Sequence, residues 1–306
     1  MSAIPVPAPP PNETPPIETP FRRFWSEFAE SKLALIGLAM LVVIILIAVF
    51  APLISPQNPY DLGQLDIMDS KLAPGEKSAA GNAHLLGTDD QGRDMLSAIF
   101  YGLRISLGVG IASTVVALAI GLFFGMIAAY FGGWVDTLIM RIVDIQLSFP
   151  AILIALILLA VLGQGVDKII VALITVQWAY YARTVRASAL VEKQKEYIEA
   201  AKVLALSKTR ILFRHMLPNC LPPLIVVATV QVAHAIALES TLSFLGLGLP
   251  ITEPSLGLLI SNGFTYLMSG KYWISFYPGL ALLLTIMSIN LVADQLRDVL
   301  NPRLKK

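Results

Sequence analysis

Residues Ile105–Phe131 read ISLGVGIASTVVALAIGLFFGMIAAYF, 27 residues without one charged side chain. A helix rises about 1.5 Å per residue, and the hydrocarbon core of a bilayer needs about 20 apolar residues to cross. This stretch is therefore long enough to span a membrane. Within it, Gly121 and Gly125 have the small-xxx-small spacing that lets two helices pack closely.

Further apolar stretches on both sides predict five more spanning helices: Leu33–Ile54, Ile145–Gly165, Ile169–Ala182, Met216–Leu238 and Ile274–Ala293. The 169–182 stretch is short, but a snorkelling Arg183 allows its helix to extend to about Leu190. Over the whole chain 56% of residues are hydrophobic and 14% are charged. In soluble domains about 45–50% of residues are apolar and about 25% are charged. We therefore expect an all-α integral membrane protein with six transmembrane helices.

Composition and motifs exclude several classes of function. A net charge of +1 gives no basic stripe for nucleic acid, and the single Cys220 gives no metal framework. Gly270-Lys271 is not part of a G-x-x-x-x-G-K-[ST] phosphate loop, and no H-E-x-x-H or G-x-S-x-G motif is present. We expect no enzyme activity, no metal and no cofactor in this chain.

The distribution of Lys and Arg predicts the orientation in the membrane. If the N-terminus is cytoplasmic, segments 1–32, 132–144, 183–215 and 294–306 are inside and carry 16 of the 22 basic residues. Because positive charge is retained inside, both termini are predicted to be cytoplasmic, and the loops at 52–104 and 239–275 external.

The chain divides into four regions on this basis. Residues 1–31 are expected to be a disordered, Pro-rich cytoplasmic tail, since the first 20 residues hold eight of the 20 prolines. Residues 32–104 supply the first span and an external loop. Residues 105–300 form a core with five spans and a cytoplasmic loop at 191–215, and residues 301–306 form a C-terminal tail.

The 191–215 loop contains one short amphipathic helix. Tyr197, Ala200, Ala201 and Leu204 recur at i, i+3, i+4 and i+7, so they form an apolar stripe. Its small residues suit a groove on another protein, whereas an interfacial helix lying on lipid is the alternative. The residues alone leave both readings open.

The order of these motifs resembles a known family. Glu199-Ala200-Ala201 followed by Leu217-Pro218 resembles the EAA loop of ATP-binding-cassette importer permeases, whose pattern usually has glycine where Ala205 stands; an alanine there is expected to continue the helix. The runs His84–Asp94, Tyr101–Leu107, Phe244–Gly248 and Leu296–Leu304 resemble the dipeptide/oligopeptide/nickel subfamily, and most closely its "C" permease.

The resemblance implies the type I importer fold and a bacterial inner-membrane subunit that forms half of a translocation pathway for peptides. It implies a homologous "B" permease, two cytoplasmic ATPase subunits that hold ATP and Mg, and an external binding protein. Nickel-chelate and glutathione-like substrates remain open. The ATPase-coupling residues would be Tyr197, Glu199, Ala200, Ala201, Leu204 and Ala205.

Two further groups of polar residues are candidates for function. Asp89, Asp90, Arg93 and Asp94 precede the second span, where they either form a solvated loop that caps a helix start and neutralises itself or dock the binding protein. Gln231 and His234 lie in the fifth span and Glu239 directly follows it at its outer end; these residues either serve structure or line the translocation path. The alternative function is a proton- or ion-coupled secondary transporter, but no acid lies in the middle of a predicted span.

Overall fold

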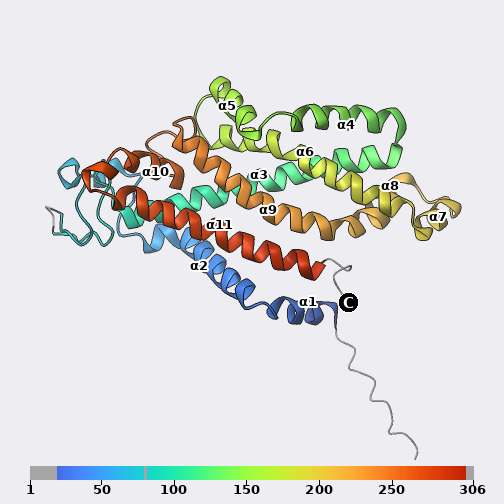
Figure 1. Cartoon of the computed structure of the whole chain (residues 1–306), viewed down its shortest axis with the longest axis horizontal. Helices are drawn as coiled ribbons and strands as arrows, with labels where there is room; N and C mark the ends of the chain where they lie inside the picture. The colour runs from blue at the N-terminus through green and yellow to red at the C-terminus, as the bar shows by residue number, and fades with distance from the viewer. Residues whose placement is uncertain (1–18, 79–80, 301–306) are drawn as a thin grey trace, which may run out of the picture.

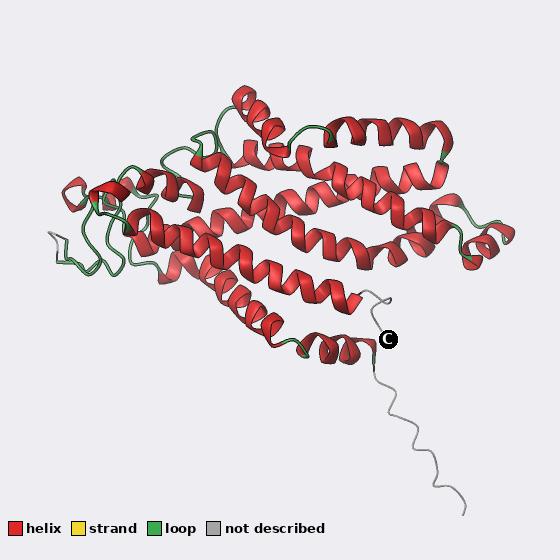
Figure 2. Cartoon of the chain, viewed as in Figure 1, coloured by secondary structure: helices red, strands yellow, loops and turns green. Residues whose placement is uncertain are grey.

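The computed structural model describes residues 19–78 and 81–300, and helices make up the regular secondary structure of these residues (Figures 1 and 2). The helices are α1 (Pro20–Ala29), α2 (Lys32–Ile54), α3 (Met95–Phe131), α4 (Gly133–Leu147), α5 (Ala151–Leu162), α6 (Val166–Lys193), α7 (Glu196–Val203), α8 (Lys208–Arg210), α9 (Leu217–Phe244), α10 (Leu256–Phe264) and α11 (Trp273–Leu300). A π-helical turn, Ile211–Met216, joins α8 to α9. The expected C-terminal tail, 301–306, lies outside the described residues.

The long helices lie side by side and give the bundle two distinct ends. Figure 1 shows α1, α7, α8 and the C-terminal end of α11 at one end, and α10 with the loop that precedes α3 at the other. The described parts of three segments predicted to be cytoplasmic, 1–32, 183–215 and 294–306, thus lie at the same end. We call this end the α7 end and the opposite one the α10 end.

Helix α3 forms the centre of the bundle and packs most extensively on α6. A Cβ atom on Gly121 would lie 2.4 Å from Tyr181 Cβ, and one on Gly125 would lie 2.6 Å from the carbonyl oxygen of Ala182. The two glycines therefore let the backbones of α3 and α6 approach as closely as the small-xxx-small spacing predicted.

The number of spanning helices differs from the sequence-based expectation. Four stretches among the described residues are long and apolar enough to cross a membrane: α2, α3, Lys208–Phe244 and α11. The pair α4 and α5 adds a fifth if it counts as one broken span. Helix α6 is 28 residues long but is not among them. Length and composition therefore support four or five spans rather than six.

The predicted span Ile145–Gly165 is wrong as one continuous helix. It is divided between α4 and α5, which meet at a bend of 88°. Pro150 causes the break, because proline lacks an N–H donor and disfavours helical geometry at the preceding Phe149.

Helix α3 begins ten residues before the uncharged stretch that predicted it. Asp94 is its N-cap, with a side chain that accepts a hydrogen bond from the Ser97 N–H. The segment Met95–Arg104, which we had assigned to the external loop, therefore forms the first turns of α3.

The N-terminal tail is partly helical, contrary to the expected disorder of residues 1–31. Helix α1 begins at Pro20 after a Thr19 cap, and its Phe28 is buried against α2 and α11. Proline at the first helical position is favourable, so the Pro-rich composition does not prevent this helix. Residues 1–18 of the expected tail lie outside the described part of the chain.

Candidate coupling helix and translocation face

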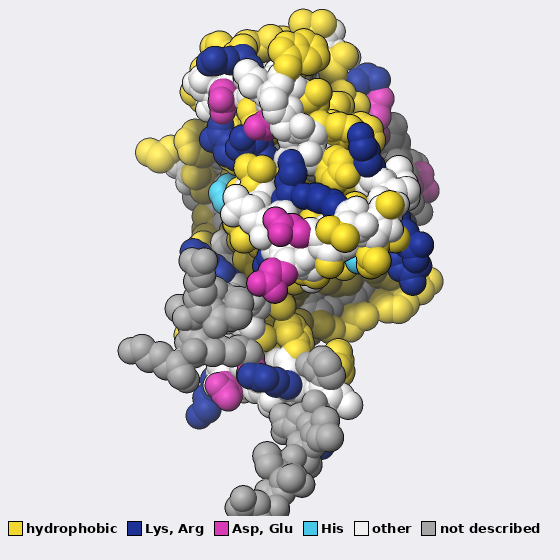
Figure 3. Space-filling model, turned by 90° about the vertical axis from the view of Figure 1, so that its right-hand side faces the viewer, with side chains coloured by type: hydrophobic (Ala, Val, Ile, Leu, Met, Phe, Trp, Pro, Cys, Tyr) yellow, Lys and Arg dark blue, Asp and Glu magenta, His cyan; other side chains and the backbone are white. Residues whose placement is uncertain are grey.

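Helix α7 stands at the tip of the α7 end (Figure 1). Its charges complement the helix dipole, because Glu196 and Glu199 lie in the first turn and Lys202 lies in the last. Figure 3 looks onto this end and shows Lys and Arg side chains spread over it. Because it stands at the tip, α7 is accessible to another molecule, and the surface around it is basic.

The outward face of α7 differs from the predicted stripe. Ile198 and Ala201 are buried within the chain's own core, where they pack in a cluster with Ile211 and Met216. Tyr197, Ala200 and Leu204 are exposed, and Glu199 is exposed beside them: together these four residues form what we call the α7 face. The predicted stripe of Tyr197, Ala200, Ala201 and Leu204 was wrong in including Ala201. Ala201 lies three residues after Ile198, so the two share the side of α7 that packs on the chain's own core.

Helix α7 ends earlier than predicted. It stops at Val203, and Ala205 adopts a left-handed backbone conformation with φ of 54°. The Leu206 N–H donates to the Ala201 carbonyl at 3.1 Å and the Ala205 N–H to the Lys202 carbonyl at 2.9 Å, which is a Schellman motif. The alanine therefore does not continue the helix. Its left-handed conformation costs about 1–2 kcal/mol, which a glycine at this position would not incur.

A hydrogen-bonded network ties the α7 face to the rest of the bundle. The Tyr197 hydroxyl donates to Glu192 at 2.6 Å and accepts from the Asn219 side-chain amide at 3.0 Å. Burial, followed by this bond to Glu192, raises the pKa of Tyr197 to about 12, so its hydroxyl remains a donor at neutral pH. The tyrosine thus fixes α7 to α6 and α9 while part of its ring faces outward.

Gln231 and His234 lie on an open face of α9. Both line a cavity of about 410 Å³ between α5, α6 and α9, which Gln177 and Tyr180 also line. Neither Gln177 nor Tyr180 stands out in the sequence by a motif, although Gln177 is a polar residue inside an apolar stretch. Gln231 also lines a second cavity of about 930 Å³, which extends along α6, α9 and α11. The two cavities share Gln231 and are lined mainly by apolar side chains with a few polar ones among them; we call the surface that they form along α9 the α9 face.

Glu239 does not join Gln231 and His234. A step of about 100° per residue turns it roughly 140° from His234 around the helix, and its side chain is fully buried. Its carboxylate accepts hydrogen bonds from Ser106 on α3 at 2.9 Å and from Ser243 at 2.8 Å. This carboxylate joins α3 to α9, so Glu239 serves structure and does not line either cavity.

The acidic segment before α3 is largely buried. Asp89 and Arg93 are 0% and 1% exposed and form an ion pair of 2.6 Å. Arg93 also donates to the carbonyl oxygen of Ile251 at 3.1 Å, across the α10 end. Such side chains cannot offer a surface to a binding protein, so docking through them is not supported.

The other two members of this segment also serve the fold. Asp94 is buried, caps α3 and contacts His84 through an Nδ1 to Oδ1 distance of 3.0 Å. Asp90 is half-buried, and burial followed by the neighbouring Asp89 raises the pKa of its carboxyl group. The expected self-neutralising helix cap is therefore present, but it is packed inside the protein rather than solvated.

Comparison with protein families identifies the chain. Residues 121–306 match the binding-protein-dependent transport system inner membrane component family, and residues 19–74 match the N-terminal TM domain of oligopeptide transport permease C. The first match covers more than half of the 306 residues. The chain belongs to this family of transport permeases.

Curated relatives of this permease match it over almost the whole chain. The dipeptide transport system permease protein DppC of Escherichia coli K12 is 42% identical over 94% of this chain and 95% of its own length. The di/tripeptide transport system permease protein DppC of Pseudomonas aeruginosa is 37% identical over 94% and 93%. A putative peptide transport system permease protein of Brucella suis is 40% identical over 88% of both chains.

The fold of the permease agrees with a solved importer. A chain of the MetNI methionine ABC transporter, in an inward-facing conformation, superposes with a TM-score of 0.55 at 22% identity, over 67% of this permease and 97% of that chain. This likeness shows the fold alone. The family match and the relatives show that the protein is a multi-pass subunit of an ABC importer in the bacterial inner membrane. ATP hydrolysis belongs to partner ATPase subunits, substrate delivery belongs to a binding protein, and the secondary-transporter alternative is set aside.

Proposed function

We propose that this permease carries peptides, and that it forms half of a translocation pathway with a homologous "B" permease. Peptides are favoured because the relatives with 36–42% identity are named as dipeptide, di/tripeptide or peptide permeases. The α9 face supports the pairing: its two cavities open to the outside of this chain and include the polar side chains of Gln231 and His234, which a path between two permeases would need.

The observation that carries the coupling role is the two-sided burial of α7. Ile198 and Ala201 fix the helix to its own chain, and the α7 face stays uncovered at the tip of the bundle. A helix held in this way transmits a push or pull to α6 and α9 through the hydrogen bonds of Tyr197. We therefore assign the α7 face, formed by Tyr197, Glu199, Ala200 and Leu204, to contact with an ATPase subunit.

Ala200→Leu tests this assignment. Ala200 is exposed on the α7 face, and overpacking of a tight interface costs about 1–3 kcal/mol, or roughly a tenfold loss of affinity. We expect the variant permease to lose its ATPase subunit during affinity purification and to take up a labelled dipeptide about tenfold more slowly in proteoliposomes.

Ala160→Leu is the matched control, since it places the same side chain on an exposed alanine of α5. It should retain the ATPase and transport at the parental rate. A lipid-facing α7 makes the opposite prediction, because leucine would strengthen its anchorage. Normal ATPase retention and uptake by Ala200→Leu would show that the α7 face does not bind the ATPase.

We also propose that both termini are cytoplasmic and that the α10 end is external. The placement of 16 of the 22 Lys and Arg residues in segments 1–32, 132–144, 183–215 and 294–306 supports this orientation. With Cys220 replaced, a cysteine at the exposed Asn82 should react with an impermeant maleimide in intact spheroplasts. Labelling that requires lysis would reverse the orientation.

A further inference from the structure

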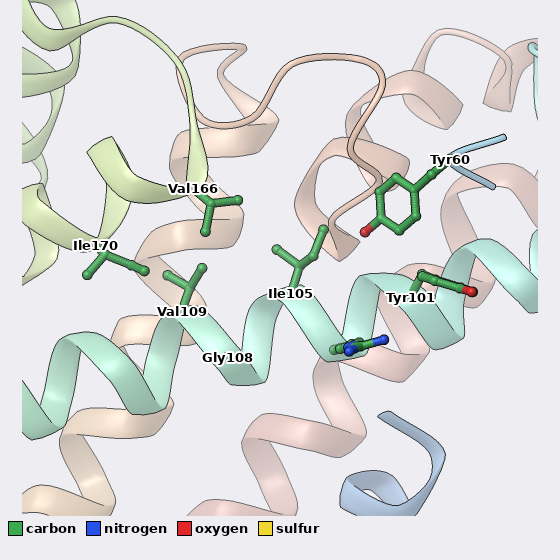
Figure 4. Close-up of a pocket in the computed structure, with 8 residues that line it drawn as sticks. Tyr60, Tyr101, Ile105, Gly108, Val109, Val166 and Ile170 are labelled. Carbon is green, nitrogen blue, oxygen red and sulfur yellow. The ribbon is translucent and has the colours of Figure 1, made fainter. Parts of the chain in front are cut away.

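A groove of about 300 Å³ lies between α3 and the N-terminal part of α6, and Tyr60 from the loop before α3 covers one end of it (Figure 4). Its lining includes Tyr60, Arg104, Ile105, Gly108, Val166 and Ile170. Figure 4 shows Val166 and Ile170 facing α3, with the Tyr60 hydroxyl directed toward the same helix. None of the functions assigned above uses this groove.

The groove faces away from the α9 face. On α3, Ser106 bonds Glu239 of α9, and a Cβ on Gly110 would lie 2.8 Å from Ile236 of α9, so this side of α3 faces α9. At about 100° per residue, Arg104 and Gly108 lie roughly 160–200° around the axis from Ser106. The groove therefore opens on the side of α3 opposite α9, where a spanning helix meets lipid.

The polar end of the groove has the chemistry of an anion site. Arg104 is exposed, and among the described residues no carboxylate lies within ion-pair distance of it. Burial, followed by the Glu253 carboxylate, raises the pKa of Tyr60 to about 12, so its hydroxyl is protonated and can donate at neutral pH. A guanidinium and a phenol together suit phosphate oxygens.

The other end of the groove is apolar and open. Ile105, Val166 and Ile170 line it, and a Cβ atom added to Gly108 would have no neighbour within 4 Å. Hydrocarbon chains fill such a space well, because it has no polar group to leave unpaired. The polarity changes from cationic to apolar within two turns of α3.

The depth of the groove in the membrane fits this polarity. Arg104 immediately precedes the 27 uncharged residues Ile105–Phe131, so it lies where α3 enters the hydrocarbon. Lipid phosphates lie at this interface, and tyrosine is enriched there. We propose that the groove binds one phospholipid of the leaflet at the α10 end, with its phosphate on Arg104 and Tyr60 and an acyl chain over Gly108.

Retention of lipid by the purified importer tests the site. The full complex is loaded with tritiated phosphatidylglycerol in nanodiscs of phosphatidylethanolamine and phosphatidylglycerol, extracted in mild detergent, and assayed for bound label. Arg104→Gln and Gly108→Phe should each retain about tenfold less label, the first by loss of a charge-assisted bond and the second by filling the groove. Arg104→Lys should restore most of the label, because an ammonium also binds phosphate.

Gly279→Phe is the matched control: this glycine of α11 also has open space around its Cβ position, so the variant reports the general effect of phenylalanine in a spanning helix. It should retain the parental amount of label. Equal retention by the parent, Arg104→Gln and Gly108→Phe would overturn the proposal. So would displacement of the label by a dipeptide, which would assign Arg104 to the substrate carboxylate instead.

Discussion

Gly121→Leu is expected to prevent the permease from folding around α3 and α6. A Cβ atom at this position would lie 2.4 Å from Tyr181 Cβ and 2.6 Å from the carbonyl oxygen of Trp178, and both belong to α6. The obstructing atoms are backbone or attached directly to it, so no rotamer change relieves the clash. The helices must separate, which we expect to cost about 3 kcal/mol or more.

The measurement is the yield of monodisperse complex after detergent extraction, with the midpoint of thermal unfolding of whatever survives. Gly279→Leu is the control, because it makes the same change in a spanning helix where the Cβ position is open. We expect the control to behave like the parent. If Gly121→Leu gave a complex of parental yield and stability, the close contact of α3 with α6 would be refuted.

Glu239→Leu is expected to have the second largest effect on stability. The carboxylate accepts hydrogen bonds from Ser106 on α3 and Ser243 on α9, and Ser255 at the start of α10 interacts with it as well. Leucine fills a similar volume but leaves these buried hydroxyls without their acceptor, at about 1–3 kcal/mol each. We expect a total loss of about 3 kcal/mol and loosening of the α10 end.

Glu239→Gln provides the comparison, because it keeps one acceptor oxygen and nearly the same shape. Its loss of stability should be less than half that of the leucine variant. For both variants we would measure the thermal unfolding midpoint of the purified complex and the rate at which a protease cleaves the loop between Leu245 and Ser255. Equal stability of the leucine variant and the parent would mean that Glu239 does not hold these helices together.

Much of this fold follows from the sequence alone. The uncharged stretches Leu33–Ile54 and Ile105–Phe131 predicted α2 and α3, because a single segment can satisfy all its own backbone hydrogen bonds inside hydrocarbon only as a helix. Spacing also predicted that Gly121 and Gly125 allow close helix packing, since the i, i+4 interval places both glycines on one side of the helix; the structure shows that the partner is α6. The motifs around Glu199-Ala200-Ala201 resembled the permease family to which the chain proved to belong.

Sequence reasoning failed where two alternatives shared the same local pattern. Ile198 with Ala201, and Tyr197 with Ala200, are both i, i+3 pairs in α7, so periodicity could not tell which pair faced the chain's own core. Similarly, Asp89 and Arg93 read as a solvated charge cluster, yet they form a buried ion pair. Burial depends on neighbours distant in sequence, such as Ile251, whose carbonyl accepts a bond from Arg93.

By itself, then, the sequence determined the features that depend on intervals along one chain: apolar length, helix spacing, charge asymmetry and motif order. Only the tertiary structure decided how far each helix runs and what each polar group touches. Glu239 shows the reason: it ended a predicted span as an isolated acid, but Ser106, 133 residues away in sequence, supplies its hydrogen bond and lets α9 continue to Phe244. The free energy of a buried polar group is set by such partners, and folding alone brings them together.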